Sequence, residues 1–130
     1  MTRITASVRV ENLSDRAAAD EGRLAVADIR AVVVTDAVVD PGAGCFSMPA
    51  TLLAELGLQH LRSEAVRVFG TARVTIQGRD CPVDILELPD GCPVVIGPVT
   101  LHALDLVVDR GQHALVGNPA HGGEHVIELY

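Results

Sequence analysis

The stretch Ala37-Val38-Val39-Asp40-Pro41-Gly42-Ala43 is the most informative part of this sequence, because it places one carboxylate between an apolar run and a turn. The valines that precede Asp40 are β-branched and favour a strand over a helix. Pro41 has no backbone N–H and fixes its own φ, so the strand ends there or lies at an edge. Asp, Pro and Gly are all turn formers, and these three residues alone also fit a plain surface turn.

Short strands separated by turns are predicted on both sides of this stretch. Two short helices interrupt them, one from Pro49, with its apolar stripe ended by Gly57, and one from Pro98 to Leu104. Residues 12–23 are polar and Ala-rich, and they fit either a short helical turn or a loose connection. Turn signals about ten residues apart favour a closed or sandwiched β fold. The predicted strands are residues 5–10, a strand through 29–34 and 37–39, and residues 66–69, 72–76, 83–88, 94–96, 106–108, 114–116 and 126–129, with 66–69 and 72–76 forming a hairpin around Gly70.

The composition predicts one domain, residues 1–130, with an aliphatic core. The chain has 130 residues, of which 48% are hydrophobic, 21% charged and only 2% aromatic. This balance supports a folded core and argues against a disordered chain. The net charge is −7 and all ten basic residues are arginines without a cluster, which argues against nucleic acid as a partner.

Neither a membrane nor a metal is expected as a partner of this chain. No apolar run approaches the roughly 20 residues that a spanning helix needs, and no signal peptide opens the sequence, so the expected location is the cytoplasm. Cys45, Cys81 and Cys92 lack paired spacing and are expected to be reduced, small hydrophobic residues. His121 and His125 are four residues apart, but Gly122 and Gly123 make a helix there improbable, so a solvated loop is expected. We expect no metal and no cofactor.

The stretch around Asp40 resembles the catalytic loop of retropepsin-like aspartic peptidases, in which two apolar residues precede Asp, then Thr or Ser, then Gly and Ala. Val94-Val95-Ile96-Gly97 is similar to the second signature of that family, an apolar strand that ends in Gly and crosses behind the catalytic loop. Further family-like segments follow in the family's order, so that the resemblance covers about residues 28–130 and is nearest to small bacterial members. They are Met48-Pro49-Ala50, residues 53–58, residues 101–109, residues 115–119, residues 121–124 and the ending Ile127-Glu128-Leu129-Tyr130.

This resemblance implies an all-β fold: a retropepsin-like closed barrel of short strands with one or two short helices and an active site at a homodimer interface. Its activity would be that of an aspartic endopeptidase acting on peptide or protein substrates. Such enzymes need two carboxylates that share one proton, and one domain offers a single suitable aspartate, so a second copy must supply the other. The residues implied are Asp40 as the catalytic residue, Pro41, Gly42 and Ala43 as its loop, Ile96 and Gly97 as the supporting second loop, and the strand ending at Tyr130 as part of the dimer contact.

Two departures from the family pattern keep other functions open. Pro41 stands where the family has Thr or Ser, whose hydroxyl and N–H tie the two catalytic loops together across the dimer. The segment 59–72 is also shorter than the hairpin that closes over a bound peptide in the family. One alternative is therefore a catalytically degenerate dimer that binds a peptide or protein partner without cleaving it. A purely structural β-barrel is the third possibility.

Overall fold

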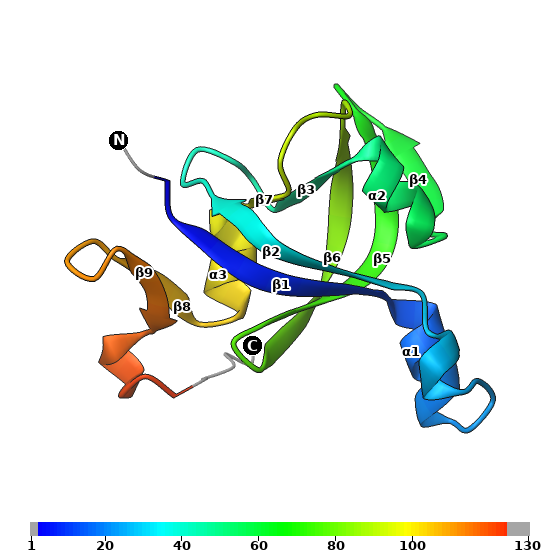
Figure 1. The fold of residues 1–130 in the computed structure, drawn as a ribbon, viewed down its shortest axis with the longest axis horizontal. Helices are drawn as coiled ribbons and strands as arrows, with labels where there is room; N and C mark the ends of the chain where they lie inside the picture. The colour runs from blue at the N-terminus through cyan, green and yellow to red at the C-terminus, as the bar shows by residue number, and fades with distance from the viewer. Residues whose placement is uncertain (1–2, 125–130) are drawn as a thin grey trace.

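Six strands close into a barrel in the computed structural model, which describes residues 3–124 (Figure 1). The strands of the main sheet are β1 (Thr5–Asn12), β2 (Ala31–Val39), β3 (Phe46–Pro49), β4 (Gln59–Ser63), β5 (Arg67–Ile76), β6 (Arg79–Leu88) and β7 (Val95–Ile96). Around the barrel their order is β1-β2-β7-β3-β6-β5, and β5 pairs back to β1, while β4 adds to the outside of β5. The predicted all-β closed barrel is therefore confirmed.

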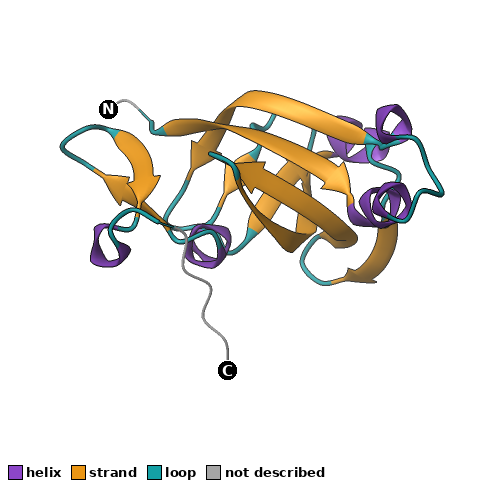
Figure 2. Cartoon of the chain, turned by 90° about the horizontal axis from the view of Figure 1, so that it is seen from below, coloured by secondary structure: helices purple, strands orange, loops and turns teal. Residues whose placement is uncertain are grey.

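Three short α-helices and a separate hairpin surround the barrel. They are α1 (Leu13–Asp20), α2 (Ala50–Glu55), α3 (Pro98–Ala103) and the strands β8 (Leu106–Asp109) and β9 (Ala114–Gly117), with 3-10 turns at η1 (Val26–Asp28) and η2 (Pro119–His121). Figure 1 shows α1 projecting from one end of the barrel and the β8–β9 hairpin at the other. The helices lie at the margins of the strands (Figure 2). No helix among residues 3–124 is long and apolar enough to cross a membrane.

The barrel interior is aliphatic, as the composition predicted. Alternate residues of β5 point inward, so that Val68, Ala72 and Val74 have no exposed surface. Phe46 is the only aromatic side chain among the buried hydrophobic residues of the described chain. Each large side chain that is fully buried stabilises the fold by about 1.5–3 kcal/mol. The largest of them are Phe46, Met48, Leu56, Ile76, Ile85, Ile96 and Leu104.

Strand β7 inserts between β2 and β3, although β2 and β3 follow one another in the chain. It runs parallel to β2, with Val39 opposite Ile96, and antiparallel to β3, with Phe46 also opposite Ile96. The loop of residues 40–45 that joins β2 to β3 must therefore pass over the end of β7. This topology brings the two family-like segments of the sequence together.

Several local predictions differ from the structure. Residues 66–76 do not turn at Gly70: β5 is continuous, with a register shift between Phe69 and Ala72, and the hairpin is formed by β4 and β5. A Cβ at Gly70 would lie 2.7 Å from Leu61 Cδ1, so the Leu61 side chain on β4 would have to shift to accept one. The helix expected to begin at Pro49 begins at Ala50, and Pro49 is the last residue of β3 and the N-cap of α2. Gly57 follows the helix with φ +60°, as predicted. The strand predicted at 126–129 lies outside the described residues.

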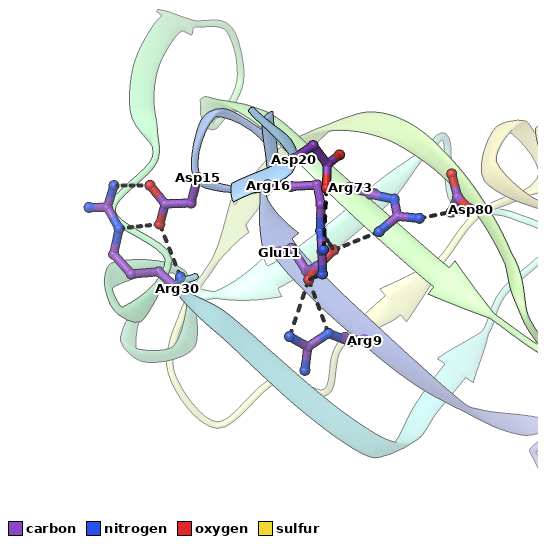
Figure 3. Close-up of polar contacts among 8 residues, drawn as sticks. All are labelled: Arg9, Glu11, Asp15, Arg16, Asp20, Arg30, Arg73 and Asp80. Atoms are coloured by element: carbon purple, nitrogen blue, oxygen red, sulfur yellow. Dashed lines mark hydrogen bonds and ion pairs between the residues drawn. The ribbon is translucent and has the colours of Figure 1, made fainter. Parts of the chain in front are cut away.

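A cluster of charges ties α1 to the barrel (Figure 3). The Glu11 side chain is 1% exposed and accepts hydrogen bonds from Arg16 at 2.7 Å and Arg73 at 2.9 Å, and from Arg9 as well. Burial on its own raises the pKa of Glu11, but the three guanidinium groups outweigh it and lower that pKa to about 2. The cluster thus joins β1, α1 and β5 through one carboxylate.

Candidate active site

Asp40 is the first residue after β2 and lies in a turn that its own chain closes. Its amide donates to the carbonyl oxygen of Ile96 at 3.0 Å, continuing the pairing of β2 with β7. The amide of Ala43 donates to the carbonyl oxygen of Asp40 at 3.2 Å, which closes a four-residue turn with Pro41 in its second position. The side chains of Asp40 and Pro41 are exposed, so the carboxylate stands at the surface of the single chain.

One oxygen of the Asp40 carboxylate is fixed and the other is available. The amide of Gly42 donates to Asp40 Oδ1 at 2.8 Å. A Cβ at position 42 would lie only 3.3 Å from that oxygen, so glycine leaves room for the carboxylate to fold back onto the turn. Asp40 Oδ2 has no hydrogen-bond partner within residues 3–124. A group that approaches from outside the chain can therefore reach Oδ2.

The segment of Ile96 and Gly97 supports the Asp40 loop from behind. The amide of Gly97 donates to the carbonyl oxygen of Cys45 at 2.6 Å, and the amide of Val99 donates to that of Gly44 at 3.2 Å. Thr100 Oγ1 also donates to the Cys45 carbonyl oxygen, at 2.9 Å. The structure therefore brings together all six residues that the sequence nominated, from Asp40 to Ala43 and at Ile96 and Gly97.

A pocket of about 270 Å³ lies away from this loop, between α2 and the ends of β5 and β6. The guanidinium of Arg67 makes two hydrogen bonds, at 2.8 and 2.7 Å, to the carboxylate of Glu87 on its wall. No residue of the Asp40 loop or of the Ile96–Gly97 segment lines it. The lining residues are Ala50, Leu53, Ala54, Gly57, Leu58, Arg67, Phe69 and Glu87.

The described residues hold no group of three or more His, Cys, Asp or Glu side chains that could bind a metal ion. His121 Nδ1 donates to Asp105 Oδ2 at 2.7 Å, and Asn118 Nδ2 donates to Asp105 Oδ1 at 3.2 Å. This contact attaches η2 to the end of α3. Sequence reasoning missed it, because a separation of 16 residues between Asp105 and His121 carries no periodic signal. His125 lies outside the described residues.

The three cysteines show no catalytic arrangement in the described chain. All are free thiols; Cys81 is buried, and Cys45 and Cys92 are half-buried. Burial raises the pKa of Cys81 to about 11, which disfavours the reactive thiolate. Cys45 Sγ lies 3.5 Å from Thr100 Oγ1, between the Asp40 loop and α3. These positions fit the expected role of small hydrophobic residues.

No family model and no curated protein sequence matches the chain. Among solved structures, the fold is similar to the retroviral protease-like domain of Ddi1 from Leishmania major, with a TM-score of 0.62 and 17% sequence identity. The similarity covers 100% of this chain and 92% of that domain. The fold of the described residues is therefore retropepsin-like, as the resemblance implied.

Proposed function

We propose that this chain is an aspartic endopeptidase that acts as a homodimer with one Asp40 from each copy. The observation that carries the proposal is the exposed Asp40 carboxylate on a glycine-containing turn at the end of β2, supported from behind by Gly97, in a retropepsin-like barrel. Peptide hydrolysis by this class of chemistry needs no metal, which agrees with the site's residue types. Peptide and protein substrates follow from the same chemistry.

The single chain offers half of the machinery, because aspartic catalysis uses two carboxylates. When two carboxylates lie about 3 Å apart, they cannot both ionise easily and share one proton. The ionised Asp40 takes a proton from the attacking water as general base, while the protonated Asp40 of the second copy donates a proton to the substrate carbonyl. In each chain the Gly42 amide holds Oδ1, which leaves Oδ2 for the water or the partner carboxylate.

A two-fold axis that passes between the two Asp40 loops is the simplest arrangement that satisfies this requirement. Such a contact is isologous, so the same surface of each copy is used. Substrate would lie between the copies as an extended strand and be recognised mainly through its backbone. The hairpin of β4 and β5 is the element that would cover it, and its turn is short, with residues 64–66 between the paired Ser63 and Arg67.

Two features favour a second candidate, a dimer of the same fold that binds a peptide or protein without cleaving it. Pro41 supplies neither an N–H nor a hydroxyl to a neighbouring loop, and each hydrogen bond missing at a buried contact costs about 1–3 kcal/mol. The hairpin that starts at β4 is short, since β4 has only five residues, and a short hairpin would exclude water poorly from a bound peptide. Both candidates share the dimer and differ in whether the Asp40 pair hydrolyses what is bound.

The decisive experiment exposes a diverse peptide mixture to the protein between pH 4 and 7 and identifies cleavage products by mass spectrometry. Wild type is compared with Asp40→Asn and with Asp36→Asn, a matched control because Asp36 is also exposed and lies on β2, the strand that Asp40 follows. We expect cuts with wild type and Asp36→Asn, and none with Asp40→Asn. A folded dimer that makes no cuts supports the binding-only candidate, and a monomer at every concentration tested refutes the dimeric mechanism.

A further inference from the structure

The turn at Asp40 occurs twice in this chain, at two sites with different surroundings. In residues 40–43 an Asp is followed by Pro41; the third residue donates to the Asp side chain at 2.8 Å and the fourth to its carbonyl oxygen at 3.2 Å. In residues 118–121 an Asn is followed by Pro119; the third residue again donates to the side chain at 3.0 Å, and the fourth to the carbonyl oxygen at 3.0 Å. The second turn lies in η2, outside the candidate site, so the geometry belongs to the local sequence.

Side-chain packing does little to fix the Asp40 turn. Asp40, Pro41 and Gly42 are all exposed, and Gly42 has no side chain that could pack against the barrel. A glycine next to a surface carboxylate would ordinarily leave the chain many conformations. What orders the turn must therefore come from its own backbone and hydrogen bonds.

Pro41 supplies that order in two ways. Its ring fixes φ near −65°, the value required in the second position of this turn. Its Cδ also clashes with a helical conformation of the preceding residue, which keeps Asp40 extended in line with β2. The Asp40 amide donates to the Ile96 carbonyl oxygen, 3.0 Å away, so the pairing with β7 continues up to the residue before Pro41.

We propose that Pro41 is a positioning residue, which forms the Asp40 turn within one chain and so directs the carboxylate before a second copy binds. The inference rests on the proposed function for its catalytic meaning, whereas the ordering of the turn stands on the structure of one chain. This role accounts for Pro41 at a position where the family has Thr or Ser. Hydrogen bonds to the neighbouring loop would order a Thr or Ser turn, whereas the proline ring orders this turn within one chain. Pro41 acts through Asp40 and need not touch the substrate.

The test measures hydrogen exchange at single amides by NMR in wild type, Pro41→Ala and Pro119→Ala. Pro119→Ala is the matched control, because it removes an exposed proline from the same type of turn elsewhere in the chain. We expect Pro41→Ala to lower the protection factors of Gly42 and Ala43 about 2- to 5-fold, as for loss of a compatible proline, and to leave amides in β5 unchanged. Pro119→Ala should lower protection only at Ala120 and His121.

Kinetics on a cleaved peptide separate positioning from simple stability. Pro41→Ala is expected to lower kcat by a similar factor or more with little change in KM, while Pro119→Ala leaves both unchanged. Unaltered protection at Gly42 and Ala43 in Pro41→Ala overturns the proposal, and so does lower protection with wild-type kcat. If wild type cleaves no peptide, the proposed function fails, yet the exchange data still decide whether Pro41 orders the turn.

Discussion

Gly97 and Cys45 lie so close that no side chain fits at position 97. The Gly97 amide donates to the Cys45 carbonyl oxygen at 2.6 Å, and a Cβ on Gly97 would lie 2.9 Å from that oxygen and overlap the carbonyl group of Gly44. Both contacts are with backbone, which cannot move without displacing the Asp40 loop. The two family-like segments of the sequence are thus joined by a contact that requires glycine.

Replacing Gly97 should therefore damage the loop and the fold together. We expect Gly97→Ala to lower the free energy of unfolding by about 1–3 kcal/mol, as for other overpacking substitutions. Gly44→Ala is the control, because a Cβ on Gly44 would meet nothing within 4 Å and its φ is not positive. Urea unfolding of both variants checks the prediction. Equal stability of Gly97→Ala and Gly44→Ala would show that the backbone contact is not rigid.

The segments that meet at this contact were predictable because each is an apolar run ended by a turn former. Val38 and Val39 stop at Pro41, and Val95 and Ile96 stop at Gly97, so both β2 and β7 were found. The family resemblance implied only that the second segment crosses behind the catalytic loop, whereas the structure shows a parallel pairing over two residue pairs. Periodicity alone could not have placed β7 between β2 and β3.

Two strands were missed for opposite reasons. All four residues of β3 are buried, so it has no alternation of polar and apolar residues. All five residues of β4 are exposed, so it shows no apolar face, and pairing with β5 is what holds it extended. The Glu11 cluster was also beyond prediction, because Arg73 is 62 residues away and reaches Glu11 only through the pairing of β1 with β5.

Glu11 should make the stability of the fold depend on acid pH. Its pKa is lowered from 4.5 to about 2 in the folded chain, so its ion pairs contribute fully above pH 4.5 and the contribution is lost as pH falls toward 2. We expect the contribution of Glu11 to the free energy of unfolding to fall by up to about 3 kcal/mol over this range. Solvent screening of the partly exposed arginines reduces this figure. Because other carboxylates titrate in both proteins, the measured quantity is the stability difference between wild type and Glu11→Gln, which should narrow from pH 5 to pH 2.

Glu21→Gln is the control for this measurement. Within residues 3–124 Glu21 forms an ion pair with Arg23, and both side chains are more than half exposed, at 59% and 65%. Exposed ion pairs contribute at most about 1 kcal/mol. The free energy of unfolding of Glu21→Gln should therefore differ from that of wild type by no more than this amount at every pH. A stability difference between wild type and Glu11→Gln that stays constant from pH 5 to pH 2 would contradict the assigned role of the arginines.

Asn12 should stabilise the fold through two separable hydrogen bonds. Its Oδ1 accepts from the Asp15 amide at 3.1 Å as the N-cap of α1, and its Nδ2 donates to the Leu56 carbonyl oxygen at 2.9 Å at the end of α2. Asn12→Ala loses both hydrogen bonds, and we expect it to lower the free energy of unfolding by about 2–3 kcal/mol. Asn12→Ser keeps a capping oxygen but cannot reach Leu56, so urea unfolding should place it between wild type and Asn12→Ala. Equal loss in both variants would mean that the cap contributes nothing.

Cys81 should be the least reactive thiol of the native protein. It is 8% exposed, and burial raises its pKa from 9.0 to about 11, which lowers the thiolate fraction near pH 8 about 100-fold relative to an unburied thiol. Iodoacetamide labelling followed by mass spectrometry should therefore modify half-buried Cys92 well before Cys81, and urea should abolish the difference. Because the thiolate is the nucleophile, early labelling of native Cys81 would require the barrel to open there and would contradict its place in the core.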